Sequence, residues 1–222
     1  PMGSTMYVWG GGWNKPDTGS GPTTMRIGLT PGWRTFYNKQ TSSYNHWNYK
    51  FDILKGLDCS GFIGFIAYNA FEYRHGNAGY VDFAEFTGPT YSKKGLGTYD
   101  TKKNYTDLKA GDVLYNRDHV YMIVGQESDG SAVIIHSSPS GVKLGGTPTR
   151  SGNKDSEAVR VATQYMKKYY PDFYNKYGKI VTPTNYLTAY NKFKWSESVV
   201  SDPHGYRQMS GSEVLEHLFN NR

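Results

Sequence analysis

The stretch DCSGFIGFIAYNAFEYRHG, residues 58–76, decides the fold of this 222-residue chain. From Ser60 to Tyr73 its apolar residues nearly encircle a helical wheel, which is typical of a helix that is buried on most sides. Gly76 offers a place for that helix to end. Cys59 falls at the start of the helix, where the partial positive charge and the N–H groups lower the pKa of a thiol. We therefore predict a buried helix with Cys59 at its N-terminus.

Three short segments further along read as strands, at residues 112–116, 119–125 and 131–137. They are rich in Val, Ile and Tyr, and Gly or Asp residues separate them. A helix followed by adjacent antiparallel strands is typical of an α+β fold, so we predict a buried helix packed on an antiparallel sheet.

The register of the last two strands decides whether His119 and His136 meet. A two-residue turn at Asp129 and Gly130 leaves the two histidines about 13 Å apart. A four-residue loop from Gln126 to Asp129 puts them directly opposite each other, with Cβ atoms ~5 Å apart. We predict the second register, or a bulged equivalent of it.

Two regions lie outside this core. Residues 14–56 are polar and show no sustained periodicity, so we expect a long insertion of loops and turns. Residues 150–222 carry helical spacing at 155–170, a break at Pro171, and a capping box formed by Ser210 and Glu213 before an apolar stripe. We expect this region to be a helical extension packed on a catalytic domain that spans residues 5–149. Residues 1–4, PMGS, read as a cloning scar, with the native N-terminus missing.

Composition excludes several classes of protein. Aromatic residues make up 16% of the chain, which excludes disorder as the main state. Apolar runs stay too short for a membrane span. The single cysteine excludes an internal disulfide and the common four-ligand zinc sites. The net charge of +6 favours polyanions, such as nucleic acid, an anionic cell wall or a membrane surface. Lys and Arg form no run longer than two, so the sequence has no basic arm of the kind that often binds nucleic acid.

Cys59 needs a base to act as a nucleophile, and that base needs an orienting partner. His119 and His136, at or near strand ends, fit these two roles. Two alternatives stay open at this point: Cys59 is a buried small hydrophobic residue, or the three side chains bind a metal. Tyr7 and Trp9 are alternatively plain core residues, and Asp58 and Asp112 alternatively only cap a helix and a turn.

Five segments, in the same order, resemble the motifs of the NlpC/P60 family of cell-wall cysteine peptidases. They are YVWGG (7–11), DCSGF (58–62), LKAGDV (108–113), HVYMIVG (119–125) and IHS (135–137). The chain departs from the family in the long separation between Tyr7 and Cys59 and in the extension after Thr149. A short Arg-containing motif common in the family is not recognisable at residues 77–85.

The resemblance implies a papain-like α+β fold and a Cys-His-His site. Cys59 is then the nucleophile, His119 the general base and later the acid, and His136 the residue that orients His119. Residues at the positions of Tyr7, Trp9, Asp58 and Ser60 help to bind substrate in the family, and we expect neither a metal nor a cofactor.

The implied activity is a peptidoglycan endopeptidase that cleaves stem peptides between γ-D-glutamate and diaminopimelate or lysine. Alternatives are an N-acetylmuramoyl-L-alanine amidase or an acyl transferase on the same fold, or an inactive wall-binding module. We expect a secreted or wall-associated monomer whose partners are stem peptides and, through its charge, anionic wall polymers.

Overall fold

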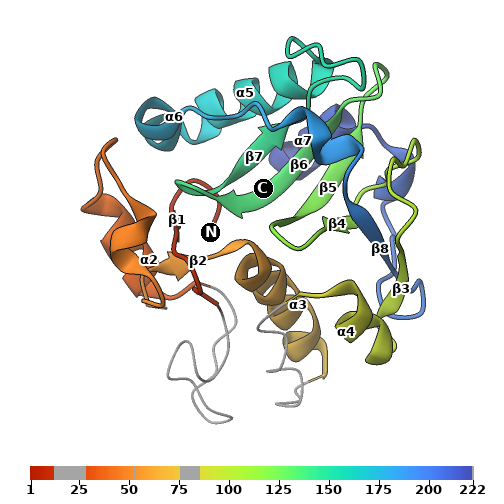
Figure 1. Ribbon diagram of the computed structural model, residues 1–222, viewed down its shortest axis with the longest axis horizontal. Helices are drawn as coiled ribbons and strands as arrows, with labels where there is room; N and C mark the ends of the chain where they lie inside the picture. The colour runs from red at the N-terminus through yellow and green to blue at the C-terminus, as the bar shows by residue number, and fades with distance from the viewer. Residues whose placement is uncertain (13–28, 53, 76–85, 222) are drawn as a thin grey trace. The chain divides into compact units, whose positions relative to one another are not determined.

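The computed structural model describes residues 1–12, 29–52, 54–75 and 86–221, with the backbone alone for 72–75. Helices and largely antiparallel strands mix along the chain, which confirms the predicted α+β class (Figure 1). The residues form two compact units. Unit 1 contains residues 1–86, 136–143 and 175–177, and unit 2 contains residues 87–135, 144–174 and 178–222.

The helix predicted from residues 60–73 is α3, Cys59–His75, in unit 1. Its side chains Phe62, Ile63 and Ala67 are almost fully buried, as the apolar wheel predicted. In the same unit β1, Met6–Tyr7, pairs in parallel with β2, Gly56–Leu57, which leads directly into α3. The first motif is thereby fixed beside the segment that carries the second.

The prediction of loops throughout residues 14–56 is wrong for part of the described segment. Pro31–Asn38 form α2, and His46–Tyr49 form the 3-10 helix η1. Pro31 at the first helical turn favours α2, and the helix buries Trp33, Phe36 and Tyr37. A single apolar face of three aromatic residues over eight positions gives little periodicity, so tertiary packing rather than the local pattern decides this helix. Residues 13–28 of the insertion lie outside the described residues.

The three predicted strands are present in unit 2 as β4, Val113–Tyr115, β5, Val120–Gln126, and β6, Ala132–Ser138, whose last three residues belong to unit 1. The strand order from β6 onward is β6-β5-β4-β8-β3. β3 is Gly97–Asp100 and β8 is Asn191–Trp195. Because β8 comes from the predicted helical extension, that extension is not purely helical. The alternation that buries Phe193 and Trp195 is the strand signal that the sequence analysis missed.

The predicted register of the β5–β6 hairpin is wrong. Met122 pairs with Ile135 and Ile123 with Ile134, which is two residues away from the predicted alignment. A bulge between Ile123 and Gly125 then shifts the pairing by one more residue. The loop closes with a hydrogen bond from the Gly130 N–H to the Glu127 carbonyl at 3.0 Å, and Gly130 adopts a positive φ of 78°. Three residues therefore form the loop instead of four, with Gly130 in the left-handed position that such hairpins require.

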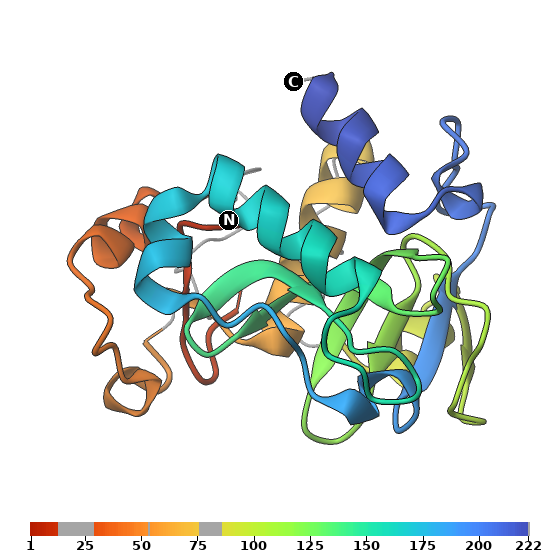
Figure 2. The same cartoon turned by 90° about the horizontal axis from the view of Figure 1, so that it is seen from above.

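The hairpin loop caps two helices of unit 2. The Glu157 N–H, at the start of α5, Glu157–Tyr169, donates to Asp129 Oδ2 at 2.8 Å. The Ser212 N–H, in the first turn of α7, Gly211–Asn220, donates to Glu127 Oε1 at 2.8 Å. Both helices lie on the same side of the strands of unit 2 in Figure 2, and α7 packs on β5. The loop thus satisfies helical N–H groups that the helices themselves leave without partners.

The other predicted features of the extension are largely confirmed. α5 ends before Pro171, where α6, Pro171–Tyr177, begins, and the Ser210–Glu213 capping box is present. Leu218 of α7 is 46% exposed, so the apolar stripe of this helix is not buried along its whole length. The remaining elements are α4, Gly88–Lys93, β7, Gly141–Gly146, and the 3-10 helices η3, Thr184–Leu187, and η4, Tyr206–Gln208.

Asp112 joins the LKAGDV segment to the extension. Its carboxylate is 1% exposed, accepts the Lys109 N–H at 3.0 Å, and pairs with the Arg207 guanidinium at 3.0 Å. Arg207 also donates to the Ala110 carbonyl at 3.0 Å. The predicted turn cap is therefore confirmed, and the same carboxylate also holds a residue nearly a hundred positions away.

Candidate active site

Cys59 is the first residue of α3, and Asp58 caps that helix. Asp58 Oδ1 accepts the Gly61 N–H at 2.7 Å and the Ser60 hydroxyl at 3.0 Å, and Oδ2 accepts the Gly10 N–H at 3.1 Å. The carboxylate therefore satisfies the helix start and also fastens the loop after Tyr7 to it. Cys59 itself is partly exposed, which excludes the alternative of a fully buried cysteine.

Tyr7 lies in the same environment as Cys59. Burial raises the pKa of the Tyr7 hydroxyl well above its ordinary value, and electrostatic interactions with Cys59 and Asp58 raise it further. The phenol therefore stays protonated at neutral pH. Its backbone is fixed on both sides, because the Tyr7 N–H donates to the Ser140 carbonyl at 2.9 Å and the Tyr7 carbonyl accepts the Tyr44 hydroxyl at 2.6 Å.

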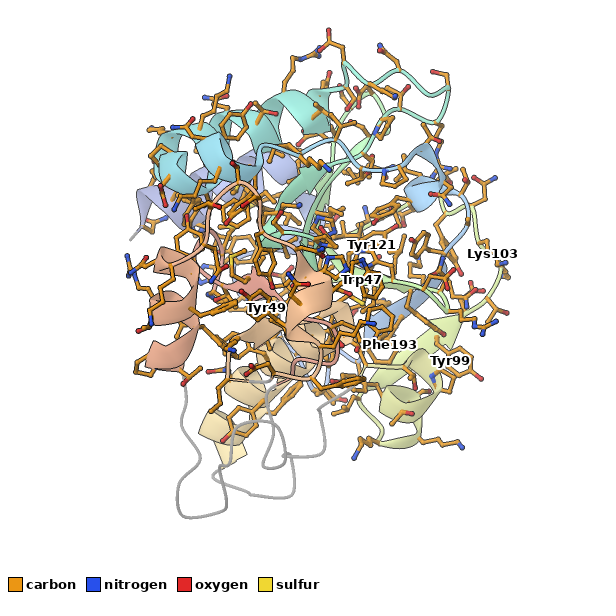
Figure 3. All side chains as sticks on the ribbon, turned by 60° about the vertical axis from the view of Figure 1, so that its left-hand side comes forward. Trp47, Tyr49, Tyr99, Lys103, Tyr121 and Phe193 are labelled. Atoms are coloured by element: carbon orange, nitrogen blue, oxygen red, sulfur yellow. The ribbon has the colours of Figure 1, made fainter. Side chains whose placement is uncertain are left out.

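Trp9 differs from Tyr7 in its exposure. The Trp9 side chain is 45% exposed, whereas Tyr7 is 5% exposed. The alternative that Trp9 is a plain core residue is therefore wrong. Its ring lies 5.9 Å from that of Trp47, which projects from η1 and is itself 53% exposed (Figure 3).

His136 is the candidate catalytic histidine that lies in unit 1. It is 4% exposed, near the end of β6, and its Nε2 lies 3.3 Å from the Ser138 hydroxyl. The Ser137 hydroxyl donates to the Leu57 carbonyl at 2.7 Å. This bond fixes the end of β6 to the residue that precedes Asp58. Unit 1 thus contains Cys59, His136 and all four predicted substrate-binding residues.

His119 belongs to unit 2, so its pairing with Cys59 and His136 stays a prediction. The backbone of His119 is fixed by Asn116, whose N–H donates to the His119 carbonyl at 3.0 Å and whose Oδ1 accepts the His119 N–H at 2.9 Å. The His119 ring lies 5.9 Å from the ring of Tyr121 and 5.5 Å from the ring of Tyr186. Two aromatic side chains that stack on each other thus lie beside the predicted general base.

Two residues of the insertion that contact Tyr7 could not be predicted from the sequence. His46 lies outside every motif of the sequence, but its ring meets that of Tyr7 edge-on at 5.3 Å, and burial lowers its pKa. Tyr44 was not considered, although its hydroxyl holds the Tyr7 carbonyl. The only signal was the density of aromatic residues in SYNHWNY, residues 43–49, which does not indicate where they pack.

Two further histidines lie in a separate cluster with Tyr206. His217 Nδ1 lies 2.9 Å from the Tyr206 hydroxyl, and the His204 ring lies 5.3 Å from that of His217. Within the described ranges, no cluster of three or more His, Cys, Asp or Glu side chains is arranged to hold a metal ion. Every helix of these ranges also falls short of what a membrane crossing needs in length or apolar character.

Comparisons of the chain with models of protein families, with curated proteins and with solved structures found no match.

Proposed function

We propose that this protein is a cysteine endopeptidase that cleaves peptidoglycan stem peptides after γ-D-glutamate. The observation that carries the proposal is the placement of Cys59 at the first position of the long helix α3, with Asp58 as its cap. A thiol at a helix N-terminus is stabilised as the thiolate, and the N–H groups of the first turn suit a developing oxyanion. The five ordered motifs of the NlpC/P60 resemblance add the substrate class, and with it the finer fold assignment of a papain-like core.

The proposed reaction uses three residues. The Cys59 Sγ attacks the γ-carbonyl carbon of D-glutamate, and His119 takes the thiol proton and gives it to the departing amine of the diamino acid. The resulting thioester is cleaved by water, whose proton His119 accepts and then returns to the Cys59 sulfur as it leaves. His136 orients His119 and fixes its tautomer.

Tyr7 and Asp58 have different parts in this proposal. Because the Tyr7 phenol stays protonated beside Cys59, it can donate a hydrogen bond to the substrate but cannot act as a base. The Asp58 carboxylate is already occupied by three donors, so its first task is to hold the cysteine loop in shape. Trp9, being exposed, is available to contact the peptide.

The proposal is tested by mass spectrometry of L-Ala-γ-D-Glu-meso-diaminopimelate incubated with the protein. Release of L-Ala-γ-D-Glu by the parent, and its loss in Cys59→Ala and His119→Gln, would support the proposal. His204→Gln is the matched control, because it removes a histidine that lies in a separate cluster with Tyr206 and His217. Hydrolysis by Cys59→Ala at the parent rate would refute the mechanism.

The same assay on intact peptidoglycan separates the alternative activities. An amidase releases the whole stem peptide from the glycan, an endopeptidase leaves a shortened stem, and a wall-binding module releases nothing. Replacing diaminopimelate by lysine in the peptide decides between the two third residues.

The charge supports a location at the cell wall, which we include in the proposal. A net charge of +6 concentrates a secreted protein at an anionic polymer. Binding to isolated walls should fall as salt is raised from about 0.1 M to about 1 M, because screening shortens the range of these attractions. Binding that is unchanged by salt would contradict a charge-driven association.

A further inference from the structure

The backbone of His119 does not by itself fix the orientation of the His119 ring. Asn116 fixes both the N–H and the carbonyl of His119. The imidazole plane nevertheless turns about a torsion whose preference is broad, so the backbone alone does not set the direction of the ring nitrogens. A base that must hold one direction therefore needs further contacts with its ring.

Tyr186 supplies such a contact from the extension. Its ring centroid lies 5.5 Å from that of His119, with an angle of 41° between the planes. Tyr121, in β5 two residues after His119, lies beside it at 5.9 Å. Aromatic contacts of this kind restrain a ring without occupying its nitrogens, which hydrogen bonding and proton transfer require.

Tyr186 is itself held firmly. It lies in η3 and is 8% exposed, and its ring stacks on Tyr121 at 4.7 Å with 10° between the planes. The Tyr121 hydroxyl donates to the Tyr186 carbonyl, which fixes the η3 backbone against β5. Tyr190 completes the cluster, with its ring 5.0 Å from Tyr121 and 5.1 Å from Tyr186. Figure 3 labels Tyr121, the member of this cluster that lies on the strand.

We propose that Tyr186 is a positioning residue for His119, so that residues 150–222 complete the general-base side of the site. This inference rests on the proposed function for its catalytic consequence, but the restraint on the ring is a property of unit 2 alone. Loss of the Tyr186 ring should lower kcat and leave KM nearly unchanged, because His119 acts in the chemical step rather than in binding. A misdirected base costs about ten- to a hundredfold in rate.

The test compares Tyr186→Leu with Tyr190→Leu, which removes a second buried ring of the same cluster. The ring signals of His119, identified by their absence in His119→Gln, are followed by NMR in each full-length variant. We expect Tyr186→Leu to shift these signals and to broaden the range of ring orientations, with Tyr190→Leu having a smaller effect. In the hydrolysis assay, only Tyr186→Leu should lower kcat about tenfold or more.

Two further variants keep the test informative if Tyr186→Leu does not fold. Tyr186→Phe keeps the ring and should retain the parent kcat and the parent His119 signals. Tyr186→Met fills the space with a flexible chain and replaces Tyr186→Leu if that variant does not fold. His119 signals that do not move, or equal losses in Tyr186→Leu and Tyr190→Leu, would overturn the inference. If the parent hydrolyses no stem peptide, the proposed function fails, and the NMR comparison alone decides the role of Tyr186.

Discussion

Removing the Asp58 carboxylate should destabilise the chain more than the loss of an ordinary helix cap. In Asp58→Ala, the Gly61 N–H and the Ser60 hydroxyl lose their acceptor, and a lost N-cap costs about 1 kcal/mol. The Gly10 N–H loses a bond to a charged acceptor as well, which adds about 1.5–3 kcal/mol. We therefore expect the free energy of unfolding to fall by about 2–4 kcal/mol, as measured by urea denaturation with an unchanged slope.

Thr87 provides the matched control for this prediction. It caps α4 through a single bond from the Thr90 N–H at 3.1 Å, and its side chain also donates to the Thr90 hydroxyl, within the same helix. Thr87→Ala should therefore cost only about 1 kcal/mol. If Asp58→Ala costs no more than Thr87→Ala, the bond to the Gly10 loop contributes nothing, and the reasoning about Asp58 is refuted.

Three further predictions concern unit 2. Asp112→Ala leaves the Arg207 guanidinium without its buried partner and should cost about 3–5 kcal/mol in urea denaturation, whereas an effect below that of an exposed Asp155→Ala would contradict this. Gly125→Ala should detach α7, because a Cβ at Gly125 would lie 2.6 Å from the Cα at the start of that helix; unchanged protection of α7 in hydrogen exchange would argue against the contact. Burial raises the pKa of Glu127 above its ordinary value of 4.5, so its ionisation destabilises the fold. The parent should therefore lose stability relative to Glu127→Gln as the pH rises above 4.5, and parallel pH profiles would exclude this.

The parts of the fold that the sequence predicted have strong local patterns. The helix that begins at Cys59 has apolar residues on nearly all its sides. The strands within residues 112–137 are rich in Val, Ile and Tyr and are separated by Gly and Asp residues. α7 carries a complete capping box. The hairpin register was not predictable in the same way. It depends on Gly130 taking a positive φ and on a bulge after Ile123, and both follow from packing that a count of loop residues does not include.

Some residues of the candidate site could likewise be predicted from the sequence, and others could not. Cys59, its cap Asp58 and the buried His136 could be selected from the sequence, because a motif names each of them. The residues that contact Tyr7, another motif residue, could not be selected in this way. Tyr44 and His46 reach Tyr7 across about forty positions, and no periodicity connects such distant segments.

These partners suggest how the added segments relate to the motifs. In unit 1, Tyr44 from the insertion fixes the Tyr7 backbone. In unit 2, Tyr186 from the extension flanks the His119 ring. In each case a residue that the motifs name for chemistry is held by a residue that lies outside them. If the proposed function holds, the aromatic richness of the chain is not only a matter of filling a core, because the Tyr186 ring would also restrain a reactive side chain and its loss should alter the chemical step.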